Sequence, residues 1–115
     1  MPFRRGEVVL VLFPDSNLRT AKRRPAVVVQ ADNLQTGLPQ KIVAMISSNM
    51  ARAGHACRVT VHHSSPAGTQ MGLHSDSVIL ADNLATVLDA EIDRVIGMCP
   101  ILPAVDAALR TTLGL

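Results

Sequence analysis

The chain has 115 residues, a hydrophobic content of 48%, two cysteines and a net charge of only +2. This length suits one domain with a small core, and the apolar content excludes a disordered chain. No apolar run approaches a membrane span, and the amino terminus lacks the pattern of a signal peptide. Cys57 and Cys99 have no C-x-x-C spacing, so we interpret them as reduced, small hydrophobic residues. We therefore expect one cytoplasmic domain over residues 1–115, with no membrane association.

The charge is unevenly distributed along the chain. Residues 1–58 carry nine Lys and Arg against three acids, a net +6, whereas residues 59–115 carry two against six, a net −4. This asymmetry favours a polyanionic or acidic partner for the first half. Phe3 and Phe13 are the only aromatic residues. A binding surface that stacks bases on aromatic rings is thereby disfavoured, so charge and hydrogen bonds must dominate any nucleic-acid binding.

Short segments rich in β-branched and apolar residues recur along the chain and predict strands. The predicted strands cover residues 7–13, 25–30, 41–47, 57–62, 77–81, 85–88 and 94–98. Turn-forming residues separate them, and the longer loops are predicted at 32–40, 50–56 and 64–75. Strands at this spacing favour a partly open barrel or a sandwich.

The carboxyl-terminal part has a different pattern. Pro100 and Pro103 are compatible only with a helix start, and Gly114 ends the pattern that follows them. The apolar residues at helical spacing are Leu102, Val105, Ala108, Leu109 and Leu113. They predict one amphipathic helix that packs on the small barrel.

A run of cations leads directly into the second predicted strand. Lys22, Arg23 and Arg24 precede Pro25, which restricts Arg24 to extended geometry at the mouth of that strand. A guanidinium held in this way is well suited to bind a phosphate. Adjacent residues of an extended chain point to opposite sides, so we expect only one of Arg23 and Arg24 to reach a phosphate. The alternative is a solvated basic loop.

Six segments together carry a resemblance to a known family. They are RGEV at 5–8, RPAVVV at 24–29, ISS at 46–48, DSVIL at 76–80, DNLATV at 82–87 and RVIG at 94–97. In this order and spacing they resemble the MazF/PemK family of toxins from type II toxin–antitoxin modules. The resemblance implies a mainly β, SH3-like barrel of the CcdB–MazF type with a carboxyl-terminal helix, usually as a homodimer. It also implies an endoribonuclease that cuts single-stranded RNA without a metal or cofactor and that a cognate antitoxin blocks.

The resemblance places the family's catalytic arginine on Arg24 and its Ser/Thr on Ser47. An arginine can stabilise the charge that builds on the phosphoryl oxygens as the 2′-hydroxyl attacks, and a serine hydroxyl can position the phosphate. This chemistry leaves a 2′,3′-cyclic phosphate and a 5′-hydroxyl. By itself, a serine at a strand end is more often a local cap. Further RNA contacts are expected from Arg19, Lys22, Arg23, Gln30, Asn33, Ser48 and Asn49.

Histidines offer a second type of ribonuclease site. His62 and His63 could act as acid and base, but consecutive strand residues face opposite ways and cannot easily flank one phosphate. His55 and His74 lie in predicted loops, and either could reach a site. No His–His or His–Cys spacing makes a metal-ligand set.

Two other functions remain open beside the endoribonuclease. One is a gyrase-targeting toxin of the same fold, although that class relies on a carboxyl-terminal tryptophan and residues 112–115 (TLGL) contain none. The other is a non-catalytic relative that binds RNA or antitoxin. Many family members carry Gln-x-Arg where residues 83–85 read NLA, so an arginine is missing there. Asp76 and Asp82 are expected to cap turns.

Overall fold

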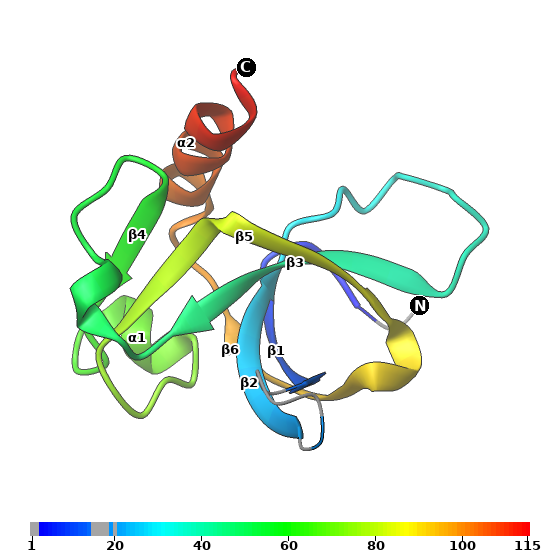
Figure 1. Cartoon of the computed structure of the whole chain (residues 1–115), viewed down its shortest axis with the longest axis horizontal. Helices are drawn as coiled ribbons and strands as arrows, with labels where there is room; N and C mark the ends of the chain where they lie inside the picture. Colours follow the sequence, from blue (N-terminus) through cyan, green and yellow to red (C-terminus); the bar gives the residue numbers. More distant parts are fainter. Residues whose placement is uncertain (1–2, 15–18, 20) are drawn as a thin grey trace.

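The computed structural model describes residues 3–14, 19 and 21–115. In this part of the chain, six strands form one antiparallel sheet in the order β4-β5-β3-β2-β1-β6 (Figure 1). The strands are β1 (Glu7–Pro14), β2 (Ala21–Val28), β3 (Gln40–Ser47), β4 (Arg58–Val61), β5 (Ser77–Leu88) and β6 (Ile92–Met98). The helices are α1 (Pro66–Gln70), α2 (Leu102–Leu113) and the short 3-10 turns η1 (Met50–Arg52) and η2 (Asp89–Glu91). The expected class, mainly β with a carboxyl-terminal helix in one domain, is confirmed.

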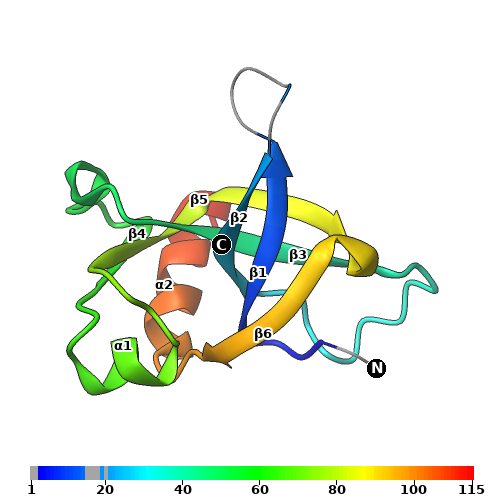
Figure 2. The ribbon, with the colours of Figure 1, turned by 90° about the horizontal axis from the view of Figure 1, so that it is seen from below.

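The sheet curls so strongly that its two faces bury two separate cores. Figure 2 shows β1 and β2 running across β3 and β5, which gives the barrel its curvature. Side chains alternate along each strand, so Ala26 and Val28 of β2 face the barrel interior, whereas Val27 faces the other core. Both faces of this strand are therefore apolar. The barrel core consists of Val9, Val11, Ala26, Val28, Val43, Met45, Val87 and Ile92.

The second core lies between the sheet, α1 and α2. Its fully or almost fully buried members include Met71, Cys99 and Val105, which join residues of β1, β2, β3, β4 and β5. Both cysteines are free, and burial raises the pKa of the Cys99 thiol. The helix α2 packs against β4 and β5 and buries Val105 and Ala108, so the predicted packing of this helix on the sheet is confirmed, although Leu113 of the same pattern is exposed. Gly114 ends this helix in a left-handed conformation with φ 71°.

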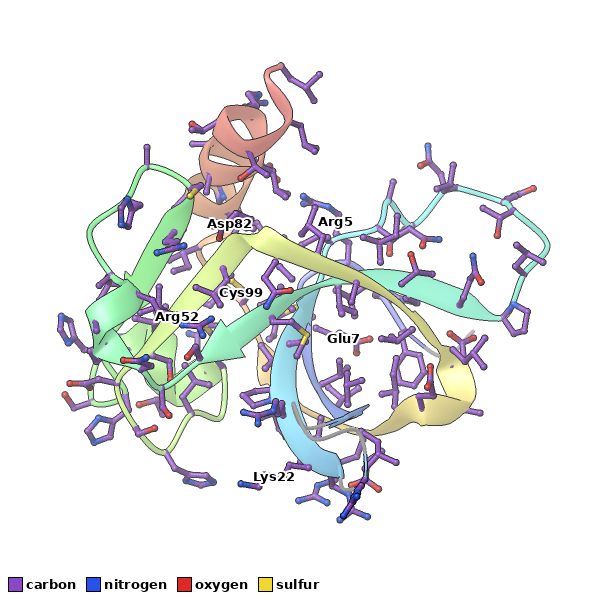
Figure 3. The ribbon with its side chains drawn as sticks, in the orientation of Figure 1. Arg5, Glu7, Lys22, Arg52, Asp82 and Cys99 are labelled. Atoms are coloured by element: carbon purple, nitrogen blue, oxygen red, sulfur yellow. The ribbon has the colours of Figure 1, made fainter. Side chains whose placement is uncertain are left out.

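Arg5 connects α2 to the end of β2. Its guanidinium donates to the carbonyl oxygen of Val29 at 2.9 Å and to the carboxylate of Asp106 in α2. Its backbone N–H donates to Asp32 Oδ1 at 2.7 Å. Arg5 therefore joins α2, the end of β2 and the loop that follows β2, and Figure 3 shows it between them.

The predicted strands at 77–81 and 85–88 are one strand, β5. The polar residues Asp82 and Asn83 suggested a break, but they are exposed because β4 pairs with β5 only as far as Leu80. Beyond that point this edge of β5 is open to solvent, so polar side chains fit within a continuous strand. The pairing of β5 with β3 shifts its register in the same region, between Ala44 and Met45 of β3.

Other boundaries also differ from the sequence prediction. The strand β2 begins at Ala21 rather than at residue 25, because pairing with β1 includes the cations, and it ends at Val28. The strand β4 ends at Val61 rather than at residue 62. The predicted loop 64–75 contains α1, whose amino terminus is capped by Ser65 and begins with Pro66.

No helix in the described ranges is long and apolar enough to cross a membrane.

Candidate active site

A cavity of about 700 Å³ opens at the end of β3, between β2, η1 and the segment that precedes β5. Three guanidinium groups line it, together with hydroxyl, amide and imidazole groups, and no carboxylate is present among the lining residues. The polar lining residues are Arg23, Arg24, Ser47, Ser48, Asn49, Arg52, His74, Ser75, Ser77 and Asn83. An excess of positive charge of this kind is suited to bind an anion.

Pro25 explains why the sheet opens at this place. Val29 donates its N–H to the carbonyl oxygen of Ile42 at 3.0 Å, so alternate residues of β2 present their backbone groups to β3. Pro25 occupies the same alternating position but has no N–H to donate. The pairing of β2 with β3 accordingly ends at Ala26 and Met45, and the cavity lies immediately beyond.

The alternation of side chains places Arg24 and Ser47 on the same face. Ala26 and Met45 are directly paired, and both point into the barrel core. Two residues further along each strand, this register leads to Arg24 on β2 and Ser47 on β3. Both residues line the cavity, although they are 23 positions apart in the sequence.

Arg23 also borders the cavity, so the cavity lining does not single out Arg24. Arg23 Nε lies 3.4 Å from Asp93 Oδ2, and that carboxylate also accepts from Arg94 Nη1 at 2.9 Å. This ion pair directs the Arg23 side chain toward β6. Both arginines lie within β2, so the alternative of a solvated loop before the strand is wrong.

The turn after β3 is organised by side-chain hydrogen bonds. Asn49 donates its backbone N–H to Ser47 Oγ at 3.1 Å, and its Oδ1 accepts from the N–H of Ala51 at 3.1 Å, which caps η1. Ser47 therefore has the local capping role typical of a serine at a strand end. This bond uses an acceptor position of the hydroxyl, so the hydroxyl hydrogen can still be donated to a ligand.

Arg52 and Asn83 line the cavity without having been predicted to, and His74, which was expected only to be able to reach a site, lines it as well. Arg52 lies in η1, where its carbonyl oxygen accepts from Arg58 Nη1 at 3.0 Å, and Figure 3 shows it near the end of β3. No local pattern distinguishes this arginine from any other loop residue. Asn83 was noted only because an arginine is missing near it.

Four of the expected RNA contacts do not line this cavity. Gln30 lies at a second cavity near the other end of β3, and its Oε1 accepts from the N–H of Ile42 at 3.1 Å. Asn33, Arg19 and Lys22 are exposed, and Figure 3 shows Lys22 near the start of β2. The rest of the basic first loop, residues 15–18 and 20, lies outside the described residues.

The paired histidines are arranged differently from the prediction. Because β4 ends at Val61, His62 and His63 do not project from opposite faces of a strand; both approach Asp76, at 3.6 Å and 2.8 Å. Hydrogen bonds from the His63 ring and backbone lower the pKa of Asp76. Asp82 is not a turn cap, because it forms an ion pair with Arg58 at 2.9 Å, which lowers its pKa.

In the chain as described, no group of three or more His, Cys, Asp or Glu side chains is placed to hold a metal ion. The cavity instead collects three guanidinium groups, four serine hydroxyls, one imidazole and two side-chain amides. Guanidinium groups can form paired hydrogen bonds with a phosphate, and amides can bind the edges of bases. This arrangement can therefore bind a phosphodiester together with its neighbouring bases.

Comparison with solved structures supports the fold over the whole chain. A toxin of Mycobacterium tuberculosis, MazF-mt6, superposes with a TM-score of 0.71 at 23% identity, covering 95% of this chain and 97% of that one. MazF from Deinococcus radiodurans gives 0.70 at 23% identity, covering 100% and 99%. A mycobacterial endoribonuclease, solved in complex with its cognate antitoxin, gives 0.72 at 20% identity, covering 98% and 96%.

The match to a family model is equally extensive. The model of the PemK-like, MazF-like toxins of type II toxin–antitoxin systems matches residues 4–113. That range includes every strand and helix of the fold and every residue that lines the cavity. The chain belongs to the PemK-like, MazF-like family of toxins of type II toxin–antitoxin systems.

Proposed function

We propose that this protein is a metal-independent endoribonuclease toxin that cuts single-stranded RNA at short sequence motifs. The observation that carries the proposal is the meeting of Arg24 and Ser47 on one face, in a cavity with three guanidinium groups and no carboxylate among its lining residues. The solved structure of a similar mycobacterial protein carries the name endoribonuclease.

The proposed reaction is attack of a ribose 2′-hydroxyl on the adjacent phosphorus. Negative charge builds on the non-bridging phosphoryl oxygens as the new bond forms, and the Arg24 guanidinium stabilises it with directed N–H donors. Ser47 donates its hydroxyl hydrogen to a phosphoryl oxygen and fixes the phosphate beside Arg24. The products are a 2′,3′-cyclic phosphate and a 5′-hydroxyl. DNA is not a substrate, because it lacks the attacking hydroxyl.

Base selection is assigned to the amides at the rim of the cavity. Asn49, which caps η1, and Asn83 of β5 line it, and their side chains can both donate to and accept from base edges. Asn49 Oδ1 already accepts from Ala51, so its NH2 group is the part available for a base. Unstacked, single-stranded bases expose these edges fully, which is why a single strand is the expected substrate.

We infer that the protein is a cytoplasmic homodimer that a cognate antitoxin inhibits. A similar mycobacterial endoribonuclease was solved in complex with its cognate antitoxin, and the similar MazF of Deinococcus radiodurans was solved together with MazE. The basic cavity favours an acidic antitoxin segment. Large exposed apolar side chains on β1 and its edge neighbour β6 favour a second copy there: Leu12 is 52% exposed, Val95 40% and Met98 45%.

The test is cleavage of a long single-stranded RNA by the purified protein in EDTA, with fragment ends mapped. We expect cuts at a recurring short motif, with cyclic-phosphate ends, that Arg24→Ala and Ser47→Ala suppress. Arg110→Ala, which removes an exposed arginine from the last turn of α2, is the matched control and should cut normally. Intact RNA from a folded wild-type sample would contradict the proposal and direct the search to a protein target.

A further inference from the structure

The proposed RNA cleavage requires a proton that the catalytic pair cannot readily supply. As the bond between phosphorus and the 5′-oxygen breaks, that oxygen becomes an alkoxide unless an acid protonates it. Arg24 keeps its proton because a guanidinium is always charged in proteins. A serine hydroxyl is also a very weak acid. Neither residue is therefore suited to protonate the leaving group.

Among the groups that line the cavity, one has the chemistry of a general acid near neutral pH. The titratable lining residues are Arg23 and Arg24 from β2, Arg52 from η1, and His74 from the segment before β5. Imidazole is the side chain whose ordinary pKa lies near neutrality, which is why it is the commonest general acid in enzymes. We propose that His74 is a third catalytic residue, which protonates the 5′-oxygen of the departing RNA fragment. This inference rests on the proposed function.

The segment that carries His74 is anchored on both sides. Before it, Gly72 has φ +73° and lies so close to β6 that an added Cβ would be 2.3 Å from the carbonyl oxygen of Ile96. After it, Asp76 accepts from the backbone N–H of His63 at 3.0 Å and from its ring at 2.8 Å. These anchors fix the backbone on both sides of His74, whose exposed side chain lines the cavity. A fixed backbone favours catalysis by positioning.

The charged groups around His74 are of two kinds. Arg23, Arg24 and Arg52 line the same cavity from the opposite elements. On its own segment the nearest acid is Asp76, and its carboxylate is engaged by both His62 and His63. Asp76 is therefore committed to a neighbouring contact.

The bonds and protons of the cleavage step balance with water as the only other reactant. The 2′-oxygen forms a bond to phosphorus and loses its proton to solvent, while the bond between phosphorus and the 5′-oxygen breaks. The imidazolium of His74 gives its proton to the 5′-oxygen, which leaves as a hydroxyl, and the neutral imidazole then regains a proton from water. Since the acid must be protonated to act, the rate should fall as the pH rises and the imidazole is deprotonated.

The first experiment compares His74→Gln with the wild type on the RNA that the wild type cuts. We expect a fall in the single-turnover rate of about 100-fold or more and the loss of the alkaline limb of the pH–rate profile. Binding is measured separately with an RNA that carries a 2′-deoxyribose at the cut site, and it should be unchanged. His55→Gln, an exposed loop histidine that does not line the cavity, is the matched control and should retain the full rate.

The second experiment replaces the leaving oxygen with sulfur. A thiolate leaves without being protonated, since thiols have a pKa near 8.5. On an RNA with a 5′-bridging phosphorothiolate, His74→Gln should cut almost as fast as the wild type, whereas Arg24→Ala should remain slow. A merely structural role of His74 cannot explain such a recovery of the cleavage rate.

The outcomes separate this inference from the function on which it rests. Wild-type protein that leaves the RNA intact would overturn the proposed function itself. If the wild type cuts and His74→Gln cuts equally well, or is equally impaired on both substrates, or is impaired only in binding, the role of His74 is overturned while the ribonuclease remains.

Discussion

The two ends of β3 each open into a cavity, and the two cavities differ in chemistry more than in size. The first, at Ser47, has a volume of about 700 Å³, and the second, at Lys41, about 590 Å³. The six residue steps from Lys41 to Ser47 span about 20 Å of strand. The second cavity is bordered by the loop between β2 and β3, which lies on the opposite side of the molecule from β4 and α1 (Figure 1).

Several polar groups of the second cavity are already engaged by other groups of the protein. Lys41 Nζ lies 3.6 Å from Asp89 Oδ1, Asp32 accepts from the N–H of Arg5, and Gln30 accepts from the N–H of Ile42. The first cavity gathers three guanidinium groups and no carboxylate among its lining residues. A cavity is therefore better judged by the balance of charge around it than by its volume.

The largest expected effect is on the rate of RNA cleavage, and it should arise from the first cavity and not from the second. Arg24→Ala should reduce the rate of RNA cleavage about 100- to 1,000-fold, because it removes the donors that stabilise the developing charge. Lys41→Met, at the other end of the same strand, should leave the rate unchanged. Single-turnover rates on one RNA check both. Equal losses would mean that the basic cavity has no special role.

Glycine substitutions compare the walls of the two cavities at two positions with nearly the same φ. Gly72 in the first cavity has φ +73°, and Gly37 in the second has φ +76°. An added Cβ at Gly72 would be 2.3 Å from Ile96 O, whereas nothing lies within 4 Å of one at Gly37. We expect Gly37→Ala to lower the free energy of unfolding by about 1 kcal/mol, through strain alone.

The corresponding loss for Gly72→Ala should be about 3 kcal/mol or more, because the loop must move away from β6 as well. Urea unfolding curves measure both values. Similar losses in the two variants would show that the loop before β5 adapts easily, and it would then be a poor support for His74.

The ion pair of the second cavity should contribute to stability. Lys41 is 17% exposed and Asp89 22%, and Asp89 Oδ1 is buried without a hydrogen bond. Lys41→Met should therefore destabilise the protein by about 1–2 kcal/mol, since it leaves this carboxylate without its cation. The double change Lys41→Met, Asp89→Leu should recover part of the loss, and a double-mutant cycle on unfolding free energies measures the coupling. Additive effects would mean that the pair contributes nothing.

The smallest effect concerns the anchor beside the first cavity and depends on pH. His63 lowers the pKa of Asp76 in the folded state below the ordinary value of 3.8. The ionised carboxylate therefore stabilises the fold above that value, and this contribution is lost as the pH falls through the lower, folded-state pKa. Asp76→Asn should reduce Tm slightly at pH 7, and the difference should shrink in acid. A constant difference down to pH 2 would contradict this account.

Local sequence patterns predicted most of the elements because they depend on neighbouring residues. The β-branched runs gave strands near their predicted positions, and α2 begins after Pro100 and ends at Gly114. The predicted strand boundaries were wrong where pairing with a neighbouring strand, rather than the local sequence, decided the structure. The cations at 22–24 became part of β2 because β1 pairs with them, and the polar pair 82–83 stayed within β5 because that edge faces solvent.

The sequence by itself determined the class of fold, the family and the two residues expected to act on a phosphate, since a short ordered set of motifs carries that information. Only the tertiary structure decided which polar side chains share a cavity. Register between β2 and β3 brings Arg24 to Ser47, and the anchors at Gly72 and Asp76 bring His74 to the same cavity. It also placed Gln30 at the other end of β3. Which of these side chains share a cavity depends on strand pairing and loop closure between residues far apart in the chain, and no local pattern encodes them.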